Sequence, residues 1–487
     1  MKIPVFFNDL EEIKGFFPKD FPVVGVGVTA FPRSALGYLL PNYMILCLLE
    51  TADLGAIRSL CPVVSLEKDL QAKLPEKFNT SEILQLTEAR KYLTDPVKFH
   101  RGASLFLYKA SKRSNRLAKE MGLKILSTPG EIRMVFENKR EFRVEAEKAG
   151  INLIEGENLS VDDLTENKWE EYRKKLGERL VFQLPDYTVG GGLSTFFINN
   201  LEDFKDFKYF VKRRREVREI VSVNVTKFIA GKQASITGCA TYYGTVTSVL
   251  QTQAIDLPEL ASLTGRSGVW LGHDWHLRFS EKEQLAAEEQ CKKWGEYVYK
   301  KGYRGIFGMD VMVDEDGKVW PVECNARYTG AFPVYTMMQI EKKEMPIDVW
   351  HLLEWLGVEY EMDIDEVQEI YRQPKEGAHL ILHNTERKFV TPTKTVKAGV
   401  YKVKHDKIEW VRDGFSFLDI KDKNEVVLCD KVVGKNMVLK PAERLGRVMF
   451  KRQVLDEKGK LLSKIEKIVK AIYSKFELMP VEKPEGY

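Results

Sequence analysis

The sequence has few cysteines and no pattern among them. Its 487 residues include six cysteines, which are widely scattered and form no CxxC motif. None is paired with histidine at a metal-binding spacing. This argues against a disulfide framework and against a zinc site, and it favours a reducing compartment.

The sequence also lacks a charge of one sign and a long apolar run. The 75 basic and 71 acidic residues leave a net charge of +4, so we expect no nucleic-acid partner. The basic run 212–215 is followed at once by acidic residues and indicates a solvated, salt-bridged face. The apolar run 38–49 is too short to span a bilayer, and no signal-peptide pattern precedes it. We therefore expect a cytoplasmic protein with no membrane partner.

The first quarter of the chain alternates between strand and helix patterns. Apolar runs predict strands at 21–28, 43–49, 104–108 and 124–127. A helix through Leu117 and Met121 fits between the last two, which is typical of a small open parallel sheet. Gly25-x-Gly27 lacks the third glycine of the dinucleotide fingerprint, so an NAD-dependent enzyme is the least favoured alternative.

A predicted hairpin between residues 308 and 327 carries opposed acidic side chains. Asp316-Gly317 lies between two apolar runs, a pattern that predicts a two-residue turn. Counting outward from that turn places Asp310 directly opposite Glu323. A one-residue slip would move Asp310 to the other face of the hairpin. The alternative is a solvated surface hairpin whose charges never meet.

In the predicted register this hairpin forms an oxygen-rich metal site. Asn325 shares the face of Glu323 because side chains alternate along a strand. Directly opposed carboxylates destabilise each other, so Asp310 and Glu323 favour a cation between them. Mg²⁺ usually takes one or two carboxylates together with substrate phosphates. Arg327 follows on the same face and could reach an anion held by that metal.

A second candidate site is rich in glycine. Gly190, Gly191 and Gly192 follow the predicted strand 180–185 and precede a second strand pattern. Consecutive glycines let backbone N–H groups wrap an anion, and the hydroxyls of Ser194 and Thr195 extend the cradle. The segment is not a P-loop, since no lysine follows the glycines and no helix begins there. A flexible hairpin loop is the alternative.

Residues 302–310, followed by Glu323-Cys324-Asn325-Ala326-Arg327, resemble the metal-binding end of the ATP-grasp superfamily. In that superfamily, Glu-x-Asn-x-Arg and an acidic residue on the preceding strand hold Mg²⁺ and the ATP phosphates. Ala326 stands where proline is common. The resemblance covers about residues 21–345 and implies a multidomain fold that combines α/β and α+β parts. Its expected domains are a Rossmann-like pre-ATP-grasp domain at 1–128, an ATP-grasp domain at 129–345 split near 222, and a β-rich C-terminal domain with a closing helix at 346–487.

The resemblance also implies contacts to ATP. Lys139, in a helix expected at 131–148, matches a lysine that contacts phosphate, and the glycine-rich segment matches a mobile lid. Lys227, Phe228 and Ile229 match the hinge whose backbone binds adenine. The strand before the lid usually ends in a lysine that meets the phosphates, whereas this chain has Gln183. An amide can bond to phosphate but carries no charge.

By this analogy the chain is a ligase that joins a carboxylate to an amine. Mg-ATP, with Mn²⁺ as an alternative metal, would convert the carboxylate to an acyl phosphate, and ADP and phosphate would be released. Lys139 and Arg327 would be catalytic. Small-molecule substrates are expected, an amino acid or a small peptide by default, and a homodimer is compatible with the sequence. The alternatives are a carboxylase component, disfavoured because no biotinyl attachment site is present, and a non-catalytic ATP-binding protein, which Gln183 would permit.

Substrate recognition is expected in two loops, at 254–279 and 327–336. The first is long and combines aromatic, histidine and arginine side chains, which favours recognition of a carboxylate or an acyl phosphate. Its candidate residues are Arg266, Trp270, His273, Asp274, His276 and Arg278. The loop after Val28, with Thr29, Arg33 and Ser34, is a further candidate for substrate contacts.

Overall fold

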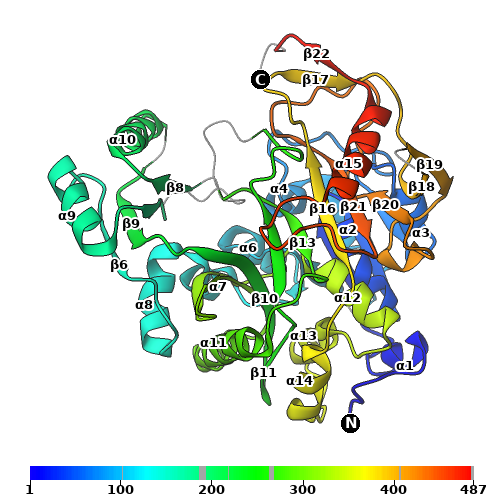
Figure 1. Cartoon of the computed structure of the whole chain (residues 1–487). Coiled ribbons are helices and arrows are strands. Elements are labelled where there is room, and N and C mark those ends of the chain that lie inside the picture. The colour runs from blue at the N-terminus through cyan, green and yellow to red at the C-terminus, as the bar shows by residue number, and fades with distance from the viewer. Residues whose placement is uncertain (101, 186–193, 218, 263–267, 405–406, 484–487) are drawn as a thin grey trace.

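The strands of the computed structural model form four sheets (Figure 1). The structure describes the whole chain except residues 101, 186–193, 218, 263–267, 405–406 and 484–487. The sheets have five, four, eleven and two strands. Among the described residues, no helix combines the length and the apolar character needed to cross a membrane.

The N-terminal sheet is parallel, as predicted. Its strands are β1 (Val23–Gly27), β2 (Tyr43–Cys47), β3 (Val63–Ser65), β4 (Ser104–Leu107) and β5 (Lys124–Ile125), in the order β3-β2-β1-β4-β5. Every residue of β1 is buried, as expected for a parallel strand covered on both faces. The short strand β3 was not predicted.

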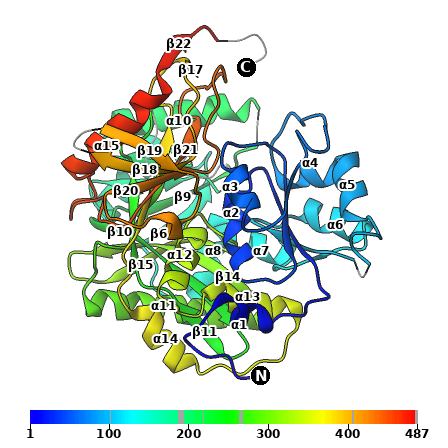
Figure 2. The same cartoon turned by 90° about the vertical axis from the view of Figure 1, so that its right-hand side faces the viewer.

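Helices cover both faces of this sheet (Figure 2). The face toward the rest of the molecule carries α2 (Phe31–Ser34), the 3₁₀ helix η1 (Ala35–Tyr38) and α3 (Leu54–Arg58). The outer face carries α4 (Thr80–Gln85), α5 (Thr87–Leu93) and α6 (Lys112–Glu120). The short helix α1 (Leu10–Gly15) lies beside the N-terminus. The inner helices share one core with helices from residues 330–356, which fixes this sheet against the rest of the chain.

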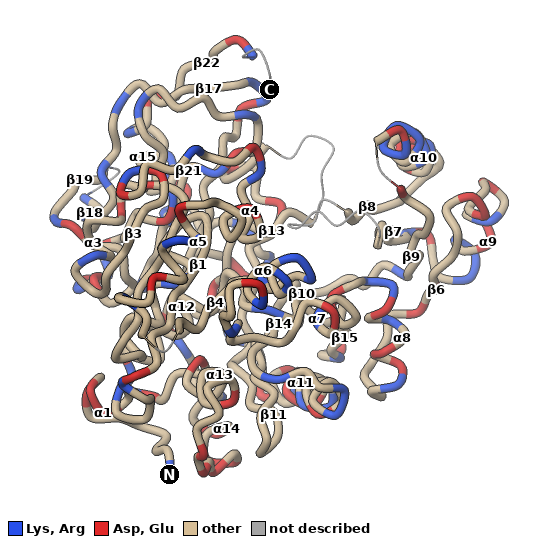
Figure 3. The backbone as a smooth tube through the Cα atoms, turned by 180° about the vertical axis from the view of Figure 1, so that it is seen from behind, with Lys and Arg blue, Asp and Glu red and all other residues tan. Residues whose placement is uncertain are grey.

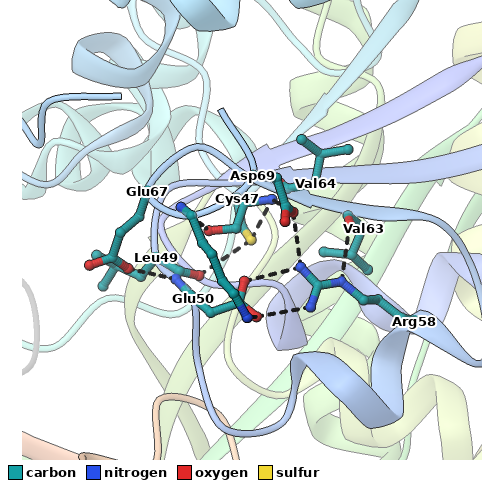
Figure 4. A network of polar contacts seen from close by, with 10 residues as sticks. Cys47, Leu49, Glu50, Arg58, Val63, Val64, Glu67 and Asp69 are labelled. Carbon is teal, nitrogen blue, oxygen red and sulfur yellow. Dashed lines mark hydrogen bonds and ion pairs between the residues drawn. The ribbon is translucent and has the colours of Figure 1, made fainter. Parts of the chain in front are cut away.

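A charged network joins the connections beyond β2 and β3 (Figure 4). The Arg58 guanidinium donates to both carboxylate oxygens of Glu50 at 2.9 and 3.0 Å, and to Asp69 Oδ2 at 2.9 Å. Its Nε donates to the carbonyl oxygen of Val63 at 3.3 Å. This bidentate geometry fixes α3 against two neighbouring connections.

The four-stranded sheet stands to the side of the main body (Figure 1). Its order is β6-β9-β7-β8, formed by β6 (Gly156–Ser160), β7 (Leu180–Gln183), β8 (Thr195–Ile198) and β9 (Ser222–Lys227). Helices α9 (Glu166–Leu176) and α10 (Leu201–Arg215) supply the aromatic core of this unit. The expected subdomain split near 222 precedes β9, yet β9 belongs to this sheet, and the next sheet begins at Gly231. The domain boundaries remain a prediction.

The basic run 212–215 forms the last turn of α10, at the periphery of the molecule (Figure 3). Arg215 pairs with Asp162 at 2.5 Å, and Lys212, Arg213 and Arg214 are exposed. Acidic and basic residues are interspersed along the backbone (Figure 3).

The largest sheet runs through the expected ATP-grasp and C-terminal domains. Its order is β15-β14-β10-β12-β13-β16-β21-β20-β18-β19, with β11 paired to β10. The strands are β10 (Gly231–Thr241), β11 (Gly244–Thr247), β12 (Gln251–Ile255), β13 (Trp270–Asp274), β14 (Gly305–Asp314), β15 (Val319–Asn325), β16 (Ala378–His383), β18 (Gly399–Lys404), β19 (Lys407–Arg412), β20 (Glu425–Cys429) and β21 (Arg444–Phe450). Since β13 pairs with β16, this sheet continues across the expected boundary at 345.

The remaining helices pack against this sheet and around its ends. They are α7 (Gly130–Glu137), α8 (Lys139–Ala149), α11 (Glu281–Lys300), α12 (Phe332–Glu341), α13 (Ile347–Leu356), α14 (Ile364–Arg372), the 3₁₀ helix η2 (Phe417–Asp419) and α15 (Ser463–Phe476). β17 (Phe389–Pro392) and β22 (Leu478–Val481) form the two-stranded sheet. A capping box of Ser280 and Glu283 opens α11, and the predicted closing helix is α15.

Two predicted elements were wrong. The single helix expected at 131–148 is two helices, because Asn138 is extended and its side chain accepts hydrogen bonds from the backbone N–H groups of Arg140 and Glu141. The asparagine thus caps α8 instead of continuing α7. The loop expected at 254–279 instead contains the strand β13, which pairs with β12 and β16.

Candidate functional site

The hairpin β14–β15 pairs Asp310 with Glu323, as predicted, but by a different route. Val313 pairs with Val319, so three residues connect Asp314 to Lys318 where two were expected. A β-bulge between Pro321 and Glu323 then shifts the register back by one residue. The two departures cancel at the acidic pair.

Both departures have a local cause. Gly317 adopts a positive φ of 76°, which glycine accepts without a Cβ penalty and which suits the last position of a three-residue loop. Pro321 has no backbone N–H and therefore cannot complete a regular ladder. The extra residue Val322 falls directly after this proline.

The paired carboxylates lie among amide groups. Gln253 Nε2 donates to Asp310 Oδ1 at 2.9 Å, and Asn325 Nδ2 donates to Asp310 Oδ2 at 3.0 Å. Burial and the neighbouring Glu323 carboxylate raise the pKa of Asp310. The raised pKa shows that two negative charges are unfavourable so close together. A bound cation would relieve this repulsion and complete the site.

Lys139 is the basic partner of this pair. Its Nζ lies 2.8 Å from Glu323 Oε2. Burial acts to raise the pKa of Glu323, but the charge and hydrogen bond of Lys139 hold it below its usual value. Lys139 is the first residue of α8. The helix break at Asn138 therefore determines the position of the lysine side chain.

The donor set suits Mg²⁺ with ligand oxygens. Among the described residues, no three or more His, Cys, Asp or Glu side chains gather in a metal-binding cluster. Asp310, Glu323 and Asn325 would supply two carboxylates and one amide oxygen, and oxygens from a nucleotide would complete the shell. That division is usual for Mg²⁺.

Arg327 lies beside this set but is held by an acidic residue that sequence reasoning missed. Its Nη2 donates to Asn325 Oδ1 at 2.7 Å, and its Nε donates to Glu137 Oε1 at 3.1 Å. Glu137 also pairs with Lys109, at 2.8 Å, and with Arg133. No sequence signal identifies Glu137, since it meets Arg327 only through the packing of α7 against β15.

A cavity of about 340 Å³ lies between the four-stranded and eleven-stranded sheets. The predicted site residues that line it are Lys139, Gln183, Thr195, Lys227, Phe228, Ile229, Asp310, Glu323, Asn325 and Arg327. Ser194 is buried but is not among the lining residues; its carbonyl accepts from the Leu184 N–H at 2.9 Å. Gly190, Gly191, Gly192 and Arg266 lie outside the described residues.

Gln183 lies at the end of β7 within a group of polar side chains. Its Nε2 donates to Thr195 Oγ1 at 3.4 Å, and its Oε1 accepts from Asn224 Nδ2 at 3.2 Å. The Asn224 Oδ1 atom is buried and has no hydrogen-bond partner among the described residues. Asn224 was missed because an asparagine within a strand carries no motif. The group can bind a polar ligand through neutral amides.

Only some of the predicted recognition residues reach the cavity. Trp270 and His273 lie on this strand and line the cavity. Asp274 is turned away from it and accepts the backbone N–H groups of Val454 and Leu455 at 2.7 and 2.9 Å. His276 and Arg278 follow the strand and are not among the lining residues. Neither are Thr29, Arg33 and Ser34.

No protein-family model matches the chain. One curated relative is the [butirosin acyl-carrier protein]–L-glutamate ligase of Niallia circulans, 26% identical over 233 residues. The match covers 45% of this chain and 51% of the relative, so the chain spans about half the length of that relative.

Solved structures match over nearly the whole chain. The biotin carboxylase of Campylobacter jejuni superposes with a TM-score of 0.58 at 10% identity, covering 95% of this chain and 93% of the other. The N5-carboxyaminoimidazole synthase of Aspergillus clavatus gives 0.56 at 11% identity, covering 93% and 100%. The phosphoribosylamine–glycine ligase of Thermotoga maritima gives 0.55 at 14% identity, covering 94% and 98%. With its parallel N-terminal sheet and its acidic hairpin above a cavity between two antiparallel sheets, the chain has the fold of the ATP-grasp superfamily.

Proposed function

We propose that this protein is an ATP-dependent ligase that joins a carboxylate to an amine through an acyl phosphate, releasing ADP and phosphate. The observation that carries the proposal is the meeting of Asp310, Glu323 and Lys139 at one wall of the cavity. Two carboxylates with a lysine suit the binding of a metal and of the phosphates that the metal neutralises.

ATP would lie along the cavity between the two sheets. The backbone N–H groups of Lys227 and Phe228 already donate to Glu155 and Arg179 carbonyls, so the hinge would bind adenine chiefly at Ile229. The phosphates would face Lys139 and Gln183, with the glycine-rich segment as their predicted lid. The fold neighbours support this occupant, since their structures include complexes with ATP, with ADP and with MgADP.

Asp310, Glu323 and Asn325 would hold Mg²⁺, which when bound neutralises charge on the β- and γ-phosphates. The carboxylate oxygen of the substrate would attack the γ-phosphorus, and ADP would leave. An amine would then attack the acyl carbon, and phosphate would leave. Arg327 would steady the anionic oxygens, and the walls of the cavity would limit hydrolysis of the intermediate.

The curated relative indicates which substrates to test first. Its name gives L-glutamate and an acyl-carrier protein as the two compounds joined. L-Glutamate is therefore the first carboxylate to test, and an amine presented on a carrier protein is a candidate acceptor beside free amino acids. Because the match covers half of that relative, both choices are starting points for the assay.

The deciding experiment measures nucleotide release. The purified chain with Mg-ATP is incubated with pools of amino acids and small carboxylates, and ADP is resolved from AMP. ADP that appears only with a carboxylate supports the ligase. AMP would indicate adenylation and would overturn the acyl-phosphate route. ADP that requires bicarbonate would favour a carboxylase.

A further inference from the structure

A row of polar side chains crosses one face of the eleven-stranded sheet, starting at the acidic pair. Directly paired residues of neighbouring strands share a face, as do residues two apart on one strand. The row follows the pairs Asp310–Ser235, Ser235–Gln251, Gln253–His273 and His273–His379. Gln253 donates to Asp310 at 2.9 Å and Gln251 donates to Ser235 Oγ at 2.9 Å, so the row is in contact with the candidate metal site.

The far end of the row is fixed by a buried arginine. Arg447 is 2% exposed, and its Nε donates to Asp430 Oδ2 at 3.1 Å. Its Nη1 contacts His379 Nδ1. A guanidinium can only donate, so His379 Nδ1 must accept. Burial keeps both histidines neutral by lowering their pKa, that of His273 to about 3. A neutral His379 therefore carries its proton on Nε2.

The tautomer of His379 determines the tautomer of His273. His379 Nε2 lies 3.0 Å from His273 Nδ1, which must accept that proton, so His273 carries its own proton on Nε2. His273 Nε2 lies 3.1 Å from Ser235 Oγ, which can accept it, and 3.3 Å from Trp270 Nε1. An indole N–H can only donate. The indole N–H is directed at His273 Nε2, which already carries a proton in this tautomer, so two donors face each other and the Trp270 N–H loses that acceptor.

With these tautomers, the hydroxyl proton of Ser235 is available to donate a hydrogen bond to a ligand. Ser235 Oγ accepts from His273 Nε2 and from Gln251 Nε2, which uses both of its lone pairs. Ser235 and His273 are each 4% exposed, and both line the cavity together with Trp270. Trp270 lies against Gly330, where a Cβ would come within 2.5 Å of the indole ring. A glycine at 330 thus permits the indole to occupy this position.

We propose that the Trp270 N–H and the Ser235 hydroxyl donate hydrogen bonds to an oxygen of the carboxylate substrate. The proposal rests on the proposed function and assigns a carboxylate subsite beside Asp310. Neutral donors suit this task, because they orient a carboxylate while leaving it more nucleophilic toward the γ-phosphorus than a bidentate arginine would. His273, His379 and Arg447 are positioning residues, since they act through Ser235 and Trp270.

The first test reads the histidine tautomers and needs no activity. The full chain, labelled with ¹⁵N-histidine, is examined by long-range ¹H–¹⁵N NMR without ligand, and the variants His273→Gln and His379→Gln assign the signals. Both residues are expected as Nε2–H tautomers. A proton on Nδ1 of His273 would let the Trp270 N–H donate to Nε2, and it would overturn the proposal.

The second test removes the indole donor while keeping a ring. Trp270→Phe is expected to raise the KM for the carboxylate that supports ADP release by about tenfold, with the Kd for ATP unchanged. Trp410→Phe, far along the sheet on β19, is the matched control, because its N–H bonds to the Ala398 carbonyl and not to a cavity residue. An unchanged KM for the carboxylate, or a loss confined to ATP affinity, would overturn the subsite.

The two failures can be told apart. If the proposed function is wrong, the unaltered chain releases no carboxylate-dependent ADP. If only the subsite is wrong, that release persists in Trp270→Phe with an unchanged KM. The tautomer measurement decides the hydrogen-bond directions in either case.

Discussion

Lys139 Nζ lies 2.8 Å from Glu323 Oε2, so a basic side chain is paired with an oxygen of a candidate metal ligand. Without nucleotide, Lys139 neutralises the carboxylate and would compete with a metal for it. With Mg-ATP bound, the same lysine would be released to the phosphates. Lys139 would then stabilise the site in both states.

Lys139→Met is expected to change metal binding and turnover in opposite directions. Removal of the competing charge should tighten Mg²⁺ binding to the nucleotide-free protein by about tenfold, while ADP release falls. Calorimetric titration with MgCl₂ and an ADP assay measure the two effects. Lys148→Met is the control, since Lys148 lies on the same helix but pairs with Glu145. Weaker Mg²⁺ binding in Lys139→Met would contradict this account.

Glu323→Gln should reduce Mg-ATP turnover by about a hundredfold while leaving the fold intact, because an amide is a poorer ligand for a hard cation. Turnover is measured as ADP release and the fold by thermal unfolding. Glu315→Gln, an exposed acidic residue in the loop of the same hairpin, should behave as the unaltered chain. Equal turnover in both variants would remove the metal site from the hairpin.

Gln183→Met should raise the Kd for ATP about fivefold, the loss expected for one neutral hydrogen bond of about 1 kcal/mol. Gln183→Glu should raise it further, because a buried carboxylate would face the phosphates. Equilibrium binding of a fluorescent ATP analogue measures both. Gln373→Met changes an exposed glutamine outside the cavity and serves as the control. Unchanged binding in Gln183→Glu would place the phosphates elsewhere.

Asp348 is expected to make stability depend on pH. It is 1% exposed, and burial raises its pKa to about 7, while a hydrogen bond from Thr336 partly opposes the rise. Between its unfolded and folded pKa values, the unfolded chain loses this proton and the folded chain keeps it. The group therefore costs stability as pH rises from about 4 to 7, with a total of about 4 kcal/mol.

Asp348→Asn should remove that dependence. The stability of the variant relative to the unaltered chain should grow by about 3 kcal/mol between pH 5 and pH 8. Urea unfolding at both pH values measures it, with the exposed Asp365→Asn as the control. A stability difference that stays constant with pH would show that Asp348 is ionised throughout.

The sequence predicted elements whose pattern is local. The five-stranded sheet was predicted except for β3, which has three residues. The acidic pair was predicted through two errors that cancel, since neither the longer loop nor the bulge after Pro321 is visible in an apolar pattern.

The sequence did not predict features that depend on distant segments. β13 was read as loop because its apolar pattern is interrupted by Gly272 and His273, and its strand geometry comes from pairing with β12 and β16. Glu137 meets Arg327 across 190 residues, and Arg447 meets His379 across 68. Contacts of this kind carry no signal in one sequence.

The bulge after Pro321 also bears on association between molecules. β15 is the terminal strand of the eleven-stranded sheet, and an edge strand offers unpaired backbone groups to strands of other chains. Pro321 has no backbone N–H, and the bulge breaks the regular spacing of the other backbone groups. The strand that carries Glu323 and Asn325 is therefore a poor template for intermolecular β-pairing. The irregularity that aligns the acidic pair would therefore also protect the same edge from aggregation.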